Sequence, residues 1–267
     1  MTLKMNAGRD RGDNPAERCS PWVGARQPSW LVFLCLVALM PRASAQTASA
    51  APPLQTIIAR MARARAENQA RFRAYVVTRD YTLFGKERHE PKSQVTVNVT
   101  FVPPDSKKYA IQQSNGTGLG ERIVRRMLAG EAQIAKDYLS TDFSPDNYDF
   151  KFFREEQLNG RRCYALELLP RRLERSLLSG IIWVDAQTYL LQRTEGAPAK
   201  KPSWWLRDVR IVLLYGGVGG MWLQTSSEAT ATVWVLGQHT MAWRDMKYSI
   251  GELVAAGPKQ AFKLDSL

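Results

Sequence analysis

Residues 180–196 decide the fold, and they read Gly-Ile-Ile-Trp-Val-Asp-Ala-Gln-Thr-Tyr-Leu-Leu-Gln-Arg-Thr-Glu-Gly. The stretch begins with β-branched and aromatic residues from Ile181 to Val184, and it continues with Asp185-Ala186-Gln187. An aspartate favours a turn at this point because its side chain hydrogen-bonds to the backbone amides that follow it. The chain from Thr188 to Arg193 is again mostly apolar. We therefore predict a β-hairpin with a strand on each side of the aspartate.

The same pattern of strand, turn and strand extends outward over most of the chain. Val95 to Phe101 alternates strictly with polar residues, and Asn159-Gly160 is a type I′ hairpin signal. The predicted strands lie near 75–83, 95–101, 107–113, 148–152, 164–168, 181–184, 188–193, 204–215, 221–224, 229–236 and 240–249. Most connections are too short for parallel crossovers. We predict a mainly β (α+β) protein whose large antiparallel sheet must curl because it has so many strands.

Two helices are expected to cap one face of this sheet. Leu54, Ile57, Ile58 and Met61 fall on one helical face, which predicts an N-terminal helix over about 53–70. Residues 121–135 predict a central helix, interrupted near Gly130, that follows the glycine-rich segment 116–120. Two interpretations of the central helix stay open. It is either a lid or plug over the sheet or a plain crossover helix.

Residues 1–45 have the features of a secretory signal peptide. The apolar core from Trp30 to Met40 is too short for a bilayer, which needs about 20 apolar residues, and Ala43-Ser44-Ala45 is a small-x-small cleavage signal. We predict cleavage after Ala45 and a periplasmic protein; an uncleaved membrane anchor is the alternative. The predicted regions are a signal peptide over 1–45, a flexible linker over 46–53, one domain over 54–250 and a loose tail over 251–267.

The composition bounds the partners. The chain has 37 basic and 25 acidic residues and a formal net charge of +12, so it is attracted to anionic lipid surfaces. Transient contact with a membrane surface is one expectation, and a basic composition without any partner behind it is the other. Export argues against a nucleic-acid partner. After cleavage the remaining cysteine is Cys163, so we expect no internal disulfide.

The residues give little support to catalysis. His89 and His239 are the two histidines, and they lie in separate turn regions without a metal-ligand spacing. Cys163 lies in an apolar strand pattern, which favours a packed thiol over a nucleophile. We predict no enzyme activity, no metal and no cofactor. Aromatic residues on the strands instead suggest an apolar cavity, with a filled core as the alternative.

Four segments resemble the bacterial outer-membrane lipoprotein-sorting (LolA-like) family. They are the helix Leu54–Met61, the strand Tyr75–Leu83, the segment Cys-Tyr-Ala-Leu-Glu-Leu-Leu-Pro at 163–170, and the hairpin from Gly180 to Arg193. The resemblance implies an open, incomplete antiparallel β-barrel closed by helices. It also implies an apolar interior that accepts the acyl chains of a lipoprotein or another lipid in the periplasm. Partners would be the sorting machinery of the inner and outer membranes.

We therefore expect a non-catalytic lipid or lipoprotein carrier that moves acyl chains between membranes. The alternative is an envelope signalling or assembly module of the same fold that binds a protein partner. Alternation selects these residues to line the cavity, with Met127 on the lid: Tyr75, Val77, Val97, Val99, Phe101, Ile111, Met127, Phe150, Phe152, Leu166, Leu168, Trp183, Trp205 and Trp234. A register error of one residue would move a strand's whole set to the opposite face.

Overall fold

The computed structural model describes residues 51–86, 88–116 and 118–251. The predicted signal peptide, its cleavage site after Ala45, and most of the predicted linker and tail lie outside the described residues. The described elements, in chain order, are α1 (Leu54–Gln69), β1 (Tyr75–Phe84), β2 (Pro91–Val102), β3 (Ser106–Gly116), α2 (Gly118–Lys136), a 3₁₀ turn (Tyr138–Ser140), β4 (Tyr148–Leu158), β5 (Arg161–Pro170), β6 (Leu178–Asp185), β7 (Leu191–Pro198), β8 (Leu206–Val218), β9 (Met221–Val233) and β10 (Gly237–Ile250).

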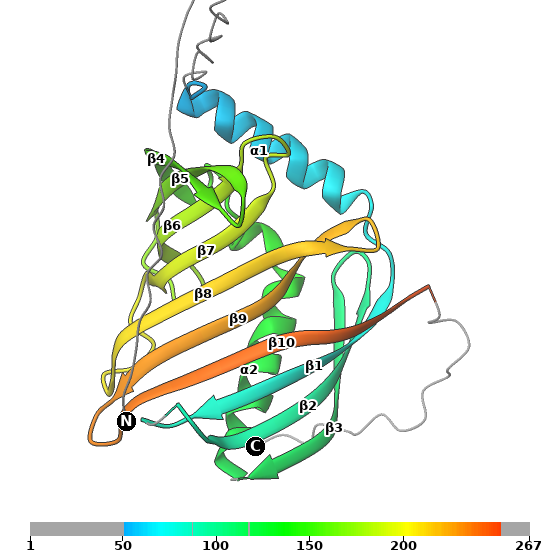
Figure 1. Ribbon diagram of the computed structural model, residues 1–267, viewed down its shortest axis with the longest axis vertical. Helices are drawn as coiled ribbons and strands as arrows, with labels where there is room; N and C mark the ends of the chain where they lie inside the picture. Colours follow the sequence, from blue (N-terminus) through cyan, green and yellow to red (C-terminus); the bar gives the residue numbers. More distant parts are fainter. Residues whose placement is uncertain (1–50, 87, 117, 252–267) are drawn as a thin grey trace, which may run out of the picture. The chain divides into compact units, whose positions relative to one another are not determined.

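All ten strands form one sheet in the order β3-β2-β1-β10-β9-β8-β7-β6-β5-β4. Every neighbouring pair is antiparallel. The described strands end in β3 on one side and β4 on the other, so the sheet is an open, incomplete barrel and not a closed one. Figure 1 shows this order, with α2 behind the sheet. The predicted fold class is confirmed.

Both helices lie on the same face of the sheet, because residues paired across an antiparallel sheet point to the same side. Tyr81 packs in the cluster under α2, and Leu166 packs in the cluster under α1. The strand registers connect these two residues through one row of partners: Tyr81, Trp243, Ser227, Leu213, Thr194, Ile182 and Leu166. We call this side the helix-bearing face and the other side the helix-free face.

The predicted hairpin forms, and its aspartate holds the turn. Asp185 Oδ1 accepts hydrogen bonds from the backbone amides of Gln187 at 2.9 Å and Thr188 at 2.8 Å. Tyr189 then takes a positive φ of 58°, so β7 begins at Leu191 and not at the predicted Thr188. Gly180 and Gly196 face each other, and a Cβ on Gly180 would lie 2.1 Å from the carbonyl oxygen of Glu195. Glycine is therefore required where these two strands come close.

Two further predictions are wrong. The predicted strands 221–224 and 229–236 are one continuous strand, β9, because its small and β-branched residues stay paired with β8 on both sides of two register shifts. The central helix is also not interrupted at Gly130, where a Cβ would meet nothing within 4 Å. The predicted type I′ turn is confirmed, since Asn159 and Gly160 both have positive φ, 51° and 76°.

Candidate functional site

Helix α2 covers an apolar surface formed by β1, β2 and β3. Val124 and Leu128 of α2 are buried on this surface. Seven predicted cavity residues gather here: Tyr75, Val77, Val97, Val99 and Phe101, all buried, together with Ile111 and Met127, which are partly buried. The structure thus brings half of the predicted set together, and α2 packs directly onto it.

A second apolar cluster lies under α1 on the same face. Ile57 and Met61 of α1 are buried there, in one cluster with apolar residues of the strands β4 to β6. Three predicted residues belong to this cluster: Leu166 and Leu168, which are buried, and Phe150, which is partly buried. The predicted set is therefore divided between the clusters under the two helices. The polar residues Thr194 and Ser227 lie between these clusters, in the row of partners that connects Tyr81 with Leu166.

The remaining four predicted residues do not lie in either cluster, and their assignment to one cavity is corrected. Trp183 pairs with Ala165 and Arg193, so it lies on the helix-free face. Phe152 is 41% exposed on the edge strand β4. Trp205 and Trp234 are in connections between strands, where they are 40% and 58% exposed.

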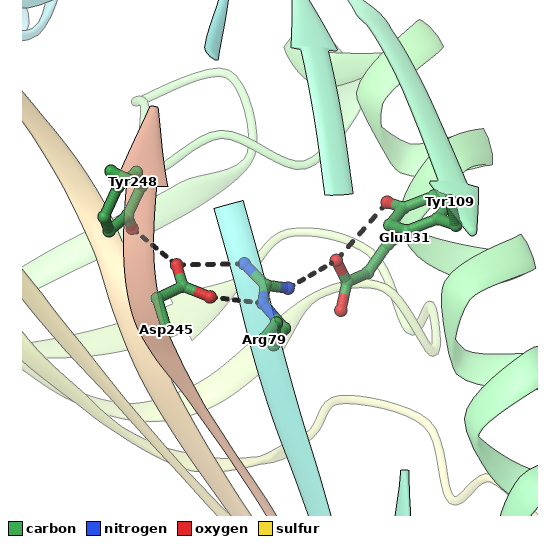
Figure 2. A network of polar contacts seen from close by, with 5 residues as sticks. All are labelled: Arg79, Tyr109, Glu131, Asp245 and Tyr248. Carbon is green, nitrogen blue, oxygen red and sulfur yellow. Dashed lines mark hydrogen bonds and ion pairs between the residues drawn. The ribbon is translucent and has the colours of Figure 1, made fainter. Parts of the chain in front are cut away.

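A buried arginine lies at the centre of the α2 cluster. Arg79 of β1 is 6% exposed. Its Nε donates to Asp245 Oδ1 of β10 at 2.6 Å, and its second terminal nitrogen donates to Asp245 Oδ2 at 3.3 Å. The other terminal nitrogen donates to Glu131 Oε2 of α2 at 3.1 Å. Figure 2 shows that Arg79 lies between the two carboxylates, so it ties the covering helix to the sheet.

Aromatic side chains surround this ion pair. The Tyr248 hydroxyl donates to Asp245 Oδ2 at 2.5 Å, and the Tyr109 hydroxyl donates to Glu131 Oε2 at 3.4 Å. The Arg79 guanidinium carbon lies 3.6 Å from the centroid of the Trp243 ring, a cation–π contact. Figure 2 shows the two tyrosines at opposite ends of the network.

The electrostatics of the network follow from its burial. Burial lowers the pKa of Arg79, but the hydrogen bond to Asp245 and the charges of Glu131 and Asp245 outweigh it and raise the pKa above its ordinary value. Arg79 is therefore a permanent cation. Burial raises the pKa of Tyr75 to about 12, and it also raises the pKa values of Tyr109 and Tyr248. The tyrosines are hydroxyl donors at neutral pH.

The sequence prediction missed this network, although one signal was present. Residues 75, 77, 79, 81 and 83 are the inward positions of β1, and the one charged residue among them is Arg79. A charge at an inward position predicts a buried partner of opposite charge. Glu131 could be placed in the same way. It follows Leu128 by three residues on α2, and residues three apart lie on the same face of a helix.

Other reactive groups give no second site. Cys163 is buried, and burial raises the pKa of its thiol to about 11, so the thiolate is scarce at neutral pH. Across the described residues, no three histidine, cysteine, aspartate or glutamate side chains gather closely enough to hold a metal ion. None of the helices in the described part of the chain has the length and apolar character needed to cross a bilayer.

No protein-family model and no curated protein matches this chain. Solved structures do match it. A domain of an outer membrane lipoprotein-sorting protein from Vibrio parahaemolyticus matches at 13% identity and a TM-score of 0.44, covering 73% of this chain and 92% of that chain. A LolA superfamily protein from Nitrosomonas europaea matches at 12% identity and a TM-score of 0.42, covering 76% and 96%.

The MucA/MucB complex of Pseudomonas aeruginosa also matches, at 10% identity and a TM-score of 0.23, with coverage of 69% of this chain and 92% of that chain. The predicted resemblance to lipoprotein-sorting proteins is thus found among solved structures, as a resemblance of fold.

Proposed function

We propose that this chain binds the acyl chains of a lipid or lipoprotein on its helix-bearing face, with α2 as a displaceable cover, and carries them between membranes of the envelope. The proposal includes export to the periplasm through the leader and involves no covalent step. It rests on one observation, the way in which α2 is held. The helix covers the apolar cluster that surrounds Arg79, and its buried polar contact with the sheet is the ion pair of Glu131 with Arg79.

An ion pair is a suitable fastening for a cover that must open. A buried ion pair contributes little net stability, because desolvation of the two charges offsets their attraction. Arg79 also keeps its bond to Asp245 when Glu131 moves away, so opening leaves no uncompensated cation. The surface released by α2 carries the side chains of Tyr75, Val97 and Phe101.

The gain from a bound ligand is large enough to displace the helix. Burial of an acyl chain contributes about 0.8 kcal/mol per CH₂, which amounts to roughly 10 kcal/mol gross for a sixteen-carbon chain. Moving α2 exposes the side chains of Val124 and Leu128, and exposing one such apolar side chain costs about 1.5–3 kcal/mol. The ligand would then occupy the surface that these two side chains leave.

The test is to weaken the tie and measure ligand binding. In Glu131→Gln the charge that holds α2 is removed while the Arg79–Asp245 pair remains. We expect a fluorescent sixteen-carbon fatty acid to bind several-fold more tightly, because the open form becomes more populated. Glu67→Gln is the matched control, since Glu67 forms an exposed ion pair with Arg63 within α1.

Two results would overturn acyl-chain binding, and a third would exclude α2 as its cover. One is that the fatty acid fails to bind both the wild type and Glu131→Gln. The other is that native mass spectrometry of protein extracted gently from the periplasm detects no lipid. Equal affinities of the wild type and Glu131→Gln would exclude α2 as the cover.

A specific observation favours a second candidate function, an envelope signalling or assembly module that binds a protein partner. The apolar residues under α2 are buried against one another in a single cluster. The helix-free face has an open groove of about 510 Å³ whose lining includes Asp80, Arg193, Arg210 and Arg244. If Arg193→Ala/Arg244→Ala abolishes capture of an envelope protein while Glu131→Gln changes no ligand affinity, this second function is favoured.

A further inference from the structure

One end of the sheet carries a cluster of exposed apolar side chains on two neighbouring connections. We name it the tryptophan tip and define it as Trp204 and Trp205, which precede β8, with Trp234, Val235 and Leu236, which join β9 to β10. Their exposed fractions are 77%, 40%, 58%, 89% and 63% in that order. Side chains of this size are normally buried, so a group of five exposed together marks an interaction surface.

Contacts between the two connections hold the tip together. The backbone amide of Trp234 donates to the carbonyl oxygen of Trp205 at 3.0 Å. The rings of Trp204 and Trp234 meet edge to face, with centroids 5.5 Å apart and an interplanar angle of 72°. The two connections therefore form one surface.

Val235 shows that the apolar residues are presented to solvent at a cost. It has a positive φ of 72°, a conformation that is unfavourable for a β-branched residue, and it is the most exposed residue of the tip. Asparagine or glycine would form this turn with less strain. The opposite end of β9 is different, because its connection to β8 is Gly219-Gly220, which carries no apolar side chain.

Basic residues flank the tip. Lys200 and Lys201 precede its first tryptophan, Arg207 follows its second, and the Lys86 side chain lies beside Gly237, directly after Leu236. The connections 85–90 and 199–205 together contain four basic residues, Lys86, Arg88, Lys200 and Lys201, against two acidic ones, Glu87 and Glu90. The field around the tip therefore favours an anionic partner.

We propose that the tryptophan tip inserts into the interface of a membrane that carries anionic lipids. Indole rings prefer the headgroup level of a bilayer, where one side of the ring is wet and the other is apolar. Val235 and Leu236 would reach the acyl boundary below, and the flanking lysines would pair with anionic headgroups. The apolar groups project from two connections with large exposed fractions, which favours a lipid surface over a protein segment.

This inference goes beyond the proposed function and does not depend on it. Acyl-chain binding takes place under α2, whereas the tip acts on the bilayer itself. The two can fail separately, because a tip variant leaves the surface under α2 unchanged.

The test uses the full chain with vesicles of phosphatidylglycerol and phosphatidylethanolamine, and with vesicles of phosphatidylcholine alone. Hydrogen–deuterium exchange is read for peptides that cover 199–207 and 233–238, so that binding by any other segment is not mistaken for binding by the tip. We expect both peptides to be protected by the anionic vesicles only. The peptide that contains Asn159-Gly160 serves as an internal reference and stays unprotected.

Variants separate the apolar and the electrostatic contributions. Trp204→Ser/Trp234→Ser should abolish the protection, and Phe153→Ser should retain it, because Phe153 is a similarly exposed aromatic residue on β4, 53% exposed. Lys200→Gln/Lys201→Gln should weaken vesicle affinity by roughly tenfold or more, since a basic residue near an anionic surface contributes about 1 kcal/mol. Lys108→Gln/Lys247→Gln, at exposed positions on the strands β3 and β10, is the charge-matched control.

The proposal is overturned if the anionic vesicles protect neither peptide, or if Trp204→Ser/Trp234→Ser binds them as well as the wild type does. Protection by a protein from the envelope in place of vesicles would also overturn it. Thermal unfolding and fatty-acid binding of each variant show whether the fold and the surface under α2 are intact.

Discussion

The two helices cover the same face of the sheet, but they are attached in different ways. The C-terminal part of helix α1 is attached by hydrogen bonds to the β9 backbone and by an ion pair to the connection before β4. The Asn68 amide donates to the Trp222 carbonyl oxygen at 2.8 Å and accepts from the Trp222 backbone amide at 2.7 Å. Arg65 also pairs with the buried Asp142 at 2.6 Å. Helix α2 is instead attached to the sheet through the buried ion pair of Glu131 with Arg79.

The surfaces beneath the two helices differ in the same sense. Under α1 the strands β4 to β6 contribute aliphatic and tyrosine side chains, and the buried carboxylate of Asp142 lies in the connection before β4 and not in a strand. Under α2 an arginine and an aspartate lie among the apolar residues. Apolar packing has no direction and favours permanent attachment, whereas a charge network has a defined geometry and can be broken at one residue. In the proposed function, α1 therefore belongs to the stable scaffold and α2 is the part of the fold that opens.

The largest effect is expected from Arg79→Met. This change leaves Asp245, with a side chain 2% exposed, and Glu131 without their shared cation. Removing one partner of a buried ion pair costs about 3–5 kcal/mol, and urea unfolding monitored by circular dichroism measures the loss.

A second variant controls for the loss of packing. Arg79→Met/Asp245→Leu/Glu131→Leu should recover most of the stability, because the network is replaced and not broken. If Arg79→Met alone lowers the free energy of unfolding by less than about 1 kcal/mol, water screens the network. The attachments of α1 and α2 would then not differ in the way described above.

An intermediate effect is expected from truncating the buried apolar contacts of each helix. Ile57→Ala, at a residue 0% exposed, should cost about 2–4 kcal/mol and speed up exchange of amides across the sheet. Leu128→Ala, at a residue 4% exposed, should instead speed up exchange mainly within α2. Hydrogen–deuterium exchange with peptide resolution distinguishes the two. If Leu128→Ala also loosens the whole sheet, α2 is part of the scaffold.

Much of the fold was predictable from the sequence because short local patterns indicate the strands and turns. The alternation of Val95 to Phe101, the Asn159-Gly160 turn and the aspartate at 185 each predict structure from a few neighbouring residues. The network was not predictable in this way. Arg79 is separated from Glu131 by 52 residues and from Asp245 by 166, so only the folded sheet brings them together.

The prediction for Trp183 failed for a different reason. The segment from Ile181 to Val184 is apolar at every position, so alternation cannot tell which residues face the helices. The register decides it, since Ile182 pairs with the buried Thr194 while Trp183 pairs with Arg193. Trp205 and Trp234 were misplaced because apolar residues in a connection have the same composition as a strand.

The smallest effect that distinguishes the cluster under α2 from the cluster under α1 is a loss of stability at alkaline pH. Burial raises the pKa of Tyr75 from the ordinary value of 10.0 to about 12, and the charge of Arg79 lowers it only in part. The folded state therefore requires the neutral phenol, while the unfolded chain ionises it near pH 10. The stability from this residue is fully present below pH 10 and is lost as the pH rises from about 10 toward about 12.

Tyr75→Phe removes this titration and keeps the ring that packs on Phe101, with centroids 5.2 Å apart. We expect the free energy of unfolding of the wild type to fall more steeply between pH 10 and pH 11 than that of the variant, as measured by urea unfolding at each pH. Exchange of α2 amides should rise over the same interval before that of α1 amides, because Tyr75 lies in the cluster under α2. Identical slopes for the two proteins would mean that the phenol is hydrated before the sheet unfolds, as it would be if α2 were already open.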